Sequence, residues 1–183
     1  MNFYALRFNL YLPLLLLAAG LAVTGCETTQ PNKPAKKEKN LATLRMHLEN
    51  RAQLANSGEK ITVLRSEPVM VTVNTDPILT ENNVVSAKLL ESPVGYAIEV
   101  KFDTSGTMIY EEYTSANPGR HFAIFSQWSD LAKDSRWLAA PLISRRNSTG
   151  VMAFTPDASL AETKLIVAGL NNNAKKIAKG KMK

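Results

Sequence analysis

Few residues of this sequence could take part in chemistry. The 183 residues include one cysteine, Cys26, and two histidines, His47 and His121. A single thiol excludes a disulfide within these residues and any metal site built from several thiolates, so Cys26 stands as a lone nucleophile. His47 lies on the polar side of an alternating stretch, which predicts a surface position. His121 enters an apolar stretch, which predicts a structural histidine rather than a catalytic base.

Motifs of common enzyme classes are missing from the sequence. It contains no nucleophile elbow, no HExxH pair and no glycine-rich phosphate loop. We therefore expect no catalytic residues, no metal site and no cofactor. The segment Asn147-Ser148-Thr149 matches a glycosylation sequon, which we interpret as a turn. The net charge of +6 suits contact with anionic headgroups but is too modest to indicate nucleic-acid binding.

Cys26 ends an apolar stretch that begins near Phe8. A short positive segment with Arg7, a leucine-rich stretch over 11–19 and small residues before Cys26 together form the architecture of an export signal. Asn9 and Pro13 interrupt the stretch, which is shorter than the roughly 20 apolar residues of a spanning helix. The alternative interpretation is an uncleaved membrane anchor. Both interpretations predict that the remainder of the chain lies outside the cytoplasm.

The residues Leu21–Cys26 resemble the lipobox of bacterial lipoproteins. The resemblance implies cleavage after residue 25, a diacylglycerol on the Cys26 thiol and an acyl chain such as palmitate on the new amino terminus. Two buried acyl chains are enough for stable anchoring, so the membrane is an expected partner. The resemblance also implies a place in the cell envelope. Glu27 leaves the choice between inner and outer membrane open.

Composition divides the chain after the predicted signal peptide of residues 1–25 into three parts. Residues 26–40 contain two prolines and a lysine cluster without apolar periodicity, which predicts a lipid-anchored flexible tether. A domain is predicted over 41–170 and a basic tail over 171–183. The five lysines after Asn173 could lie on an anionic surface, but a frayed, solvated tail is the preferred interpretation.

Hydrophobic periodicity predicts an α+β fold with a mostly antiparallel sheet and two helices packed on one face. Strands are expected over 44–48, 61–64, 69–73, 84–90, 96–102, 121–125 and 151–154, with the first two forming a hairpin. One helix is expected over 107–116, with Met108, Ile109 and Tyr113 buried, and a polar loop over 127–136. A second helix is expected to start at Thr155-Pro156-Asp157 and to stop at Gly169.

The order of several short motifs resembles the head subdomain in the first periplasmic domain of SecD, an accessory subunit of the protein-export translocase. The motifs are Val94-Gly95, residues 97–103, Gly106, Tyr113-Thr114, residues 117–120, residues 123–125, Ala140-Pro141, Ile143, Gly150, residues 154–157 and residues 169–171. SecD couples ion flow to export through transmembrane helices. We find no stretch after Cys26 that could span a bilayer, so the resemblance implies a head-like module rather than a translocation motor.

These observations predict a lipid-anchored envelope lipoprotein that binds polypeptides or envelope proteins without catalysis, with a link to protein export. Trp128, Arg136 and Trp137 flank the predicted polar loop and are the expected partner contacts. The alternative for Trp137 is that it packs against the sheet. The alternative function is a structural component of an envelope protein complex.

Overall fold

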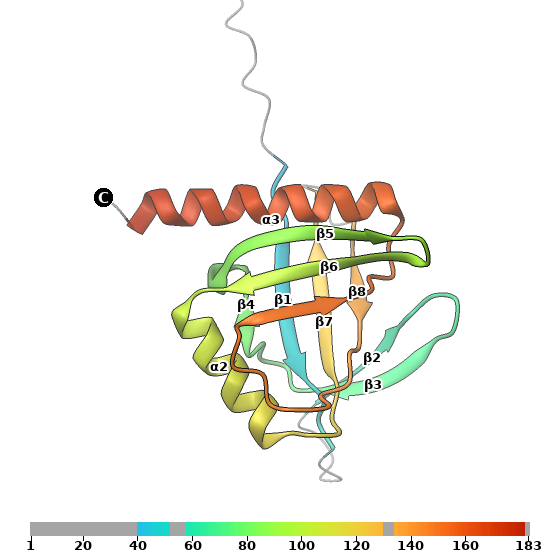
Figure 1. The fold of residues 1–183 in the computed structure, drawn as a ribbon. Coiled ribbons are helices and arrows are strands. Elements are labelled where there is room, and N and C mark those ends of the chain that lie inside the picture. The colour runs from blue at the N-terminus through green and yellow to red at the C-terminus, as the bar shows by residue number, and fades with distance from the viewer. Residues whose placement is uncertain (1–39, 52–57, 130–133, 182–183) are drawn as a thin grey trace, which may run out of the picture. The chain divides into compact units, whose positions relative to one another are not determined.

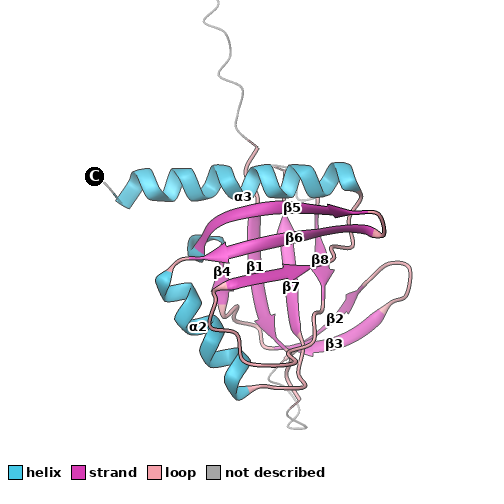
Figure 2. Cartoon of the chain, viewed as in Figure 1, coloured by secondary structure: helices cyan, strands magenta, loops and turns pink. Residues whose placement is uncertain are grey.

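A computed structural model describes residues 40–51, 58–129 and 134–181 (Figure 1). These residues form, in chain order, β1 (Thr43–Leu48), β2 (Glu59–Val63), β3 (Val69–Val73), β4 (Leu79–Thr80), the 3-10 helix η1 (Glu81–Asn83), β5 (Val84–Ser92), β6 (Gly95–Phe102), α2 (Thr104–Ala116), β7 (Phe122–Gln127), β8 (Ser135–Ala139), β9 (Val151–Phe154) and α3 (Leu160–Lys181). All strand pairs are antiparallel, and the predicted α+β class is confirmed (Figure 2). The predicted signal peptide and nearly all of the tether lie outside the described residues.

The strands form three sheets rather than one. The largest has the order β4-β1-β7-β8, the second is β5-β6-β9, and the third is the hairpin β2-β3. The predicted β1–β2 hairpin is wrong, because β4 and β7 occupy the two edges of β1 and β2 pairs with β3. Alternation shows that a segment is a strand, but it carries no information about a partner distant in the sequence, such as Phe122 opposite Leu48.

The main core lies between the two larger sheets and the helices. β1 contributes Leu44 and Met46, β6 contributes Ile98 and Val100, and each of these side chains is completely buried. The predicted period of two explains this arrangement, since residues i and i+2 lie on one face of a strand. Burying each such side chain contributes roughly 1.5–3 kcal/mol to stability.

The hairpin β2-β3 covers part of the opposite face of the four-stranded sheet. Ile61, Val63, Val71 and Val73 pack there against Ala123. His47 points to this face and is only 8% exposed, so its predicted surface position is wrong. Its ring Nδ1 lies 2.9 Å from the backbone oxygen of Asn74, and the ring meets the edge of Trp137. The sequence pattern of β1 alone could not predict the burial of His47, because the hairpin that packs over it comes from another segment of the chain.

Helix α2 begins three residues before the predicted start. The carboxylate of Asp103 accepts a hydrogen bond of 2.8 Å from the backbone N–H of Gly106, which caps the helix. Tyr110 packs against the rings of two core phenylalanines. Ile109 and Tyr113 are half-buried, as expected, whereas Met108 is 65% exposed, contrary to the prediction. The buried face of α2 consists of Gly106, Tyr110 and Thr114, so Met108 lies on the opposite face of the helix.

Helix α3 differs from its prediction at both ends. It begins at Leu160, because Ser159 and Glu162 form a capping box: the Glu162 carboxylate accepts from the Ser159 N–H (2.7 Å), and the Ser159 hydroxyl accepts from the Glu162 N–H. Gly169 does not stop the helix, which continues to Lys181, so residues 171–181 are helical rather than a frayed tail. Gly169 serves packing instead: an added Cβ would lie 2.6 Å from the Cβ of Ala42.

Helix α3 packs along β5, and α2 lies beside β4 and β6 (Figure 1). Strand β8 begins within the predicted loop 127–136, and β7 extends to Gln127. Within the described ranges we found no helix with the length and apolar character needed to cross a membrane.

Candidate functional site

Trp128 is a core residue. It is 2% exposed and belongs to the main hydrophobic cluster. The guanidinium of Arg136 lies over its ring, 5.0 Å from the centroid, as a cation–π contact. The expectation that Trp128 contacts a partner is therefore corrected, since a partner cannot reach this indole in the folded domain. The polar residues around Trp128 in the sequence gave no sign of its burial.

Arg136 joins strand β8 to the start of α3. Its Nη2 donates to the Glu162 carboxylate (2.6 Å), and its Nη1 donates to the backbone oxygen of Asp157 (3.2 Å). The hydrogen bond from the Ser159 N–H, together with Arg136, lowers the pKa of Glu162 against the opposing effect of partial burial. The donors of Arg136 thus have partners inside the fold, and contact with another protein remains a prediction.

Trp137 lies on the other side of strand β8. Its ring makes edge contacts with His47 (5.1 Å between centroids) and Phe125 (5.4 Å) and packs against the hairpin cluster. The structure therefore brings Trp128 and Arg136 together and separates Trp137 from them. Trp137 packs against the sheet, as the alternative expectation stated, and it stays half-buried.

His121 is held by Glu49, as expected for a structural histidine. The Glu49 carboxylate accepts from the His121 backbone N–H (2.8 Å) and lies 2.9 Å from His121 Nδ1. Arg51 donates to the same carboxylate at 3.1 Å. Partial burial raises the pKa of Glu49, but the hydrogen bonds from His121 and the charge of Arg51 outweigh it, so the net pKa lies below the ordinary 4.5.

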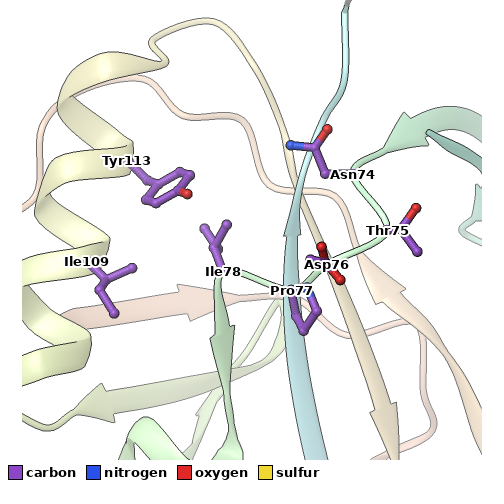
Figure 3. Close-up of a pocket in the computed structure, with 7 residues that line it drawn as sticks. All are labelled: Asn74, Thr75, Asp76, Pro77, Ile78, Ile109 and Tyr113. Atoms are coloured by element: carbon purple, nitrogen blue, oxygen red, sulfur yellow. The ribbon is translucent and has the colours of Figure 1, made fainter. Parts of the chain in front are cut away.

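A pocket of about 550 Å³ opens between α2 and the segment that joins β3 to β4 (Figure 3). The lining residues are Asn74, Thr75, Asp76, Pro77, Ile78, Ile109 and Tyr113. The joining segment is fixed to β1, because the Asn74 N–H donates to the Leu48 oxygen (3.0 Å) and the Ile78 N–H donates to the Met46 oxygen (2.8 Å). The two walls of the pocket are thus a helix and a strand-bound segment.

The lining of this pocket combines two kinds of side chain. Ile109 and Tyr113 of α2 and Ile78, next to β4, form the apolar part of the lining (Figure 3). Asn74 and Asp76 lie on the side of the pocket further from α2. Apolar walls with a few polar groups at one side are typical of binding pockets. The sequence prediction missed this site, because it treated residues 74–77 only as a turn.

The titratable groups near the pocket do not form a metal centre. Among the residues that the structure describes, no three histidine, cysteine, aspartate or glutamate side chains are close enough to hold a metal ion. The pocket offers apolar contact area and hydrogen-bonding groups, and these features suit the binding of a partner side chain.

Comparisons with known proteins agree with this fold. The chain aligns in structure with a chain described as a membrane component SecDF that enhances protein export, with a TM-score of 0.51 and 17% identity over 73% of this chain and 63% of the other. SecDF in a super-membrane-facing form gives a TM-score of 0.50 and 17% identity over 73% of this chain and 19% of the other. The chain thus spans less than two thirds of either relative. No curated protein sequence matches it.

The sequence itself matches a protein family. Residues 53–174, well over half of the chain, match the family described as SecDF, P1 head subdomain. The matched range includes the motifs between Val94 and Asn171 that resemble the SecD head, so the predicted resemblance is confirmed. Because the family match and the structural likeness agree, this chain belongs to the SecDF P1 head subdomain family.

Proposed function

We propose that this protein is a lipid-anchored, extracytoplasmic module that binds polypeptide segments without catalysing a reaction, in association with protein export. The observation that carries the proposal is the pocket between α2 and residues 74–78. An apolar side chain of an extended polypeptide fits between Ile78 and Ile109, and the polar groups of Asn74 and Asp76 can bond to its peptide groups. Such contacts would bind extended polypeptides with apolar side chains in general rather than one particular sequence.

Two further observations support this proposal. The family match links the domain to SecDF, and one of its structural relatives is described as enhancing protein export. The lipobox-like residues before Cys26 support anchoring by a lipid on this thiol. A tethered binding module could hold polypeptide segments close to the membrane from which they emerge.

The test is photo-cross-linking in intact cells from a photoreactive residue in place of Ile109. The matched control carries the same residue in place of Met108, which neighbours Ile109 in α2 but is exposed and does not line the pocket. We expect a spread of exported polypeptides to be linked from position 109 and few from position 108.

The pattern of adducts separates the two functions. One dominant envelope protein, captured at a fixed ratio, would contradict polypeptide binding and favour a structural component of a complex. Equal capture from both positions would show that the pocket is not the binding site.

A further inference from the structure

The outward face of α3 is basic and largely exposed in the described domain. Leu165, Ala168, Lys175, Lys176 and Lys179 are exposed and recur at helical spacing; we call these five residues the outward face. The inward side of the helix, with Ile166 and Leu170, is completely buried against the sheets.

The charge on α3 is strongly one-sided. Glu162 is the only acid of the helix, and Arg136 neutralises it, whereas three lysines of the outward face follow without any acid. The C-terminal turns of α3 also extend past the edge of the sheets (Figure 1). The three lysines are exposed, and no ion pair joins them to a carboxylate of the described residues.

The chain enters the domain beside this same face. The Asn40 side chain donates to the Leu165 oxygen (2.7 Å), and Asn172 donates to the Asn40 oxygen (2.9 Å). Asn173 donates to the Ala42 oxygen (2.5 Å), so the start of the domain is fastened to α3. The 13 residues between Cys26 and Asn40 reach at most about 50 Å when fully extended, so a lipid on Cys26 would keep the start of the domain within that distance of the membrane.

We propose that the outward face of α3 is a second membrane contact, which lies on anionic lipid headgroups and orients the domain. This inference rests on the proposed anchoring through Cys26. Lysines close to an anionic surface each strengthen binding roughly fivefold, and the exposed Leu165 adds apolar area at the headgroup boundary.

The contact would also set the direction of the polypeptide pocket. Asn40 and α3 lie at the start of β1, whereas the pocket segment is bonded to Met46 and Leu48 at its end. With α3 on the membrane, the pocket faces away from the lipid surface and stays open to emerging polypeptides.

The test uses the full acylated protein in vesicles of phosphatidylcholine alone or with one third phosphatidylglycerol. An environment-sensitive fluorophore is attached to Ala168→Cys, and the matched control carries it at Thr62→Cys, an exposed position on β2. Acylation blocks the thiol of Cys26, so each protein carries one label. We expect the emission of the fluorophore at position 168 to shift to the blue only in the anionic vesicles, and the emission at position 62 not to shift. The blue shift should be lost in 1 M salt, because the Debye length there is about 3 Å.

Variants of the three lysines test whether their charge causes the blue shift. Changing Lys175, Lys176 and Lys179 together to Gln should abolish the blue shift, because binding of the face falls roughly 100-fold. The triple change to Arg should retain it. Identical emission in the two vesicles, or a Gln variant that keeps the shift, would overturn the proposal.

Failure of the anchoring itself gives a different result. A chain without the lipid on Cys26 does not float with the neutral vesicles and takes up a second label on its free thiol. An anchored protein without a blue shift contradicts only the role of α3.

Discussion

At the residue scale, two charged groups hold the ends of strand β7. Glu49 binds His121 just before the strand, and Arg136 covers Trp128 just after it. Hydrogen bonds to charged groups contribute about 1.5–3 kcal/mol when well formed, and partial exposure reduces this value. Both groups therefore contribute to the stability of the fold.

The lowered pKa of Glu49 makes a prediction about acid stability. A carboxyl group with a pKa below 4.5 in the folded state stabilises it above about pH 4.5 and loses this contribution as the pH falls through the folded-state pKa. Glu49→Gln should lower the free energy of unfolding by about 1 kcal/mol at pH 7. It should also make that energy less dependent on pH between about 5 and 3. Urea unfolding at several pH values measures both effects, and an unchanged slope would contradict the assignment.

The burial of Trp128 predicts a large effect of truncation. Trp128→Ala should reduce the free energy of unfolding by about 3–5 kcal/mol, because it leaves a cavity in the core and removes the partner of Arg136. Trp137→Ala, at a half-buried ring, serves as the comparison and should cost less. Denaturant unfolding measures both variants, and a stable Trp128→Ala protein would refute the core placement.

Residue types in the sequence did not reveal which polar and aromatic side chains are buried. His47 alternates with apolar residues along β1, and its burial depends on the β2-β3 hairpin, which comes from another segment of the chain. Trp128 has polar neighbours in the sequence, yet it belongs to the main hydrophobic cluster. His121 could be assigned a structural role because an apolar strand follows it directly. The pocket was missed because its two walls come from different parts of the chain.

At the scale of elements, alternation predicted most strands close to their observed positions, and helical spacing predicted α2 to within three residues, whereas β8 was not predicted and α3 extends well beyond its predicted stop. The pairing of strands could not be predicted, since β1 bonds to β7 across most of the domain sequence. The start of α3 was predictable in principle, because Ser159 and Glu162 have the spacing of a capping box. The proline of Thr155-Pro156-Asp157 gave a stronger but misleading start signal.

Substitutions of Gly169 and Gly180 in α3 distinguish the effect of close packing from the effect of helix propensity on stability. Gly169→Ala should destabilise the domain by about 1–3 kcal/mol, because the new methyl group meets Ala42 and pushes the helix from β1. Gly180→Ala is the matched control: nothing lies within 4 Å of its Cβ position, so it should stabilise the helix by about 0.5 kcal/mol. Thermal unfolding distinguishes them, and stabilisation by both changes would contradict the close approach of α3 to β1.

At the scale of the whole molecule, the order of short motifs along the chain was sufficient to predict the family. The match over residues 53–174 confirms the SecD-like head, and the resemblance of residues 21–26 to a lipobox adds a hypothesis about where that head works. A lipid on Cys26 is the central element of the proposed localisation, because it would hold the domain at a membrane surface.

Anchoring through Cys26 can be tested by itself. Wild-type protein should incorporate a labelled fatty acid and sediment with membranes, whereas Cys26→Ser should incorporate none and lose the membrane anchor. Metabolic labelling followed by fractionation gives the answer. Incorporation of label into the Cys26→Ser protein would contradict the lipobox assignment.

The measurement that tests the polypeptide-binding role most directly is the affinity for an unfolded polypeptide. Fluorescence anisotropy of a labelled, reduced and carboxymethylated polypeptide would be titrated with the wild-type protein, with Ile109→Ser and with the control Met108→Ser. We predict at least tenfold weaker binding for Ile109→Ser, with circular dichroism unchanged, and wild-type binding for Met108→Ser. Equal affinity of all three proteins, or no binding by the wild type, would contradict a polypeptide-binding pocket on this domain.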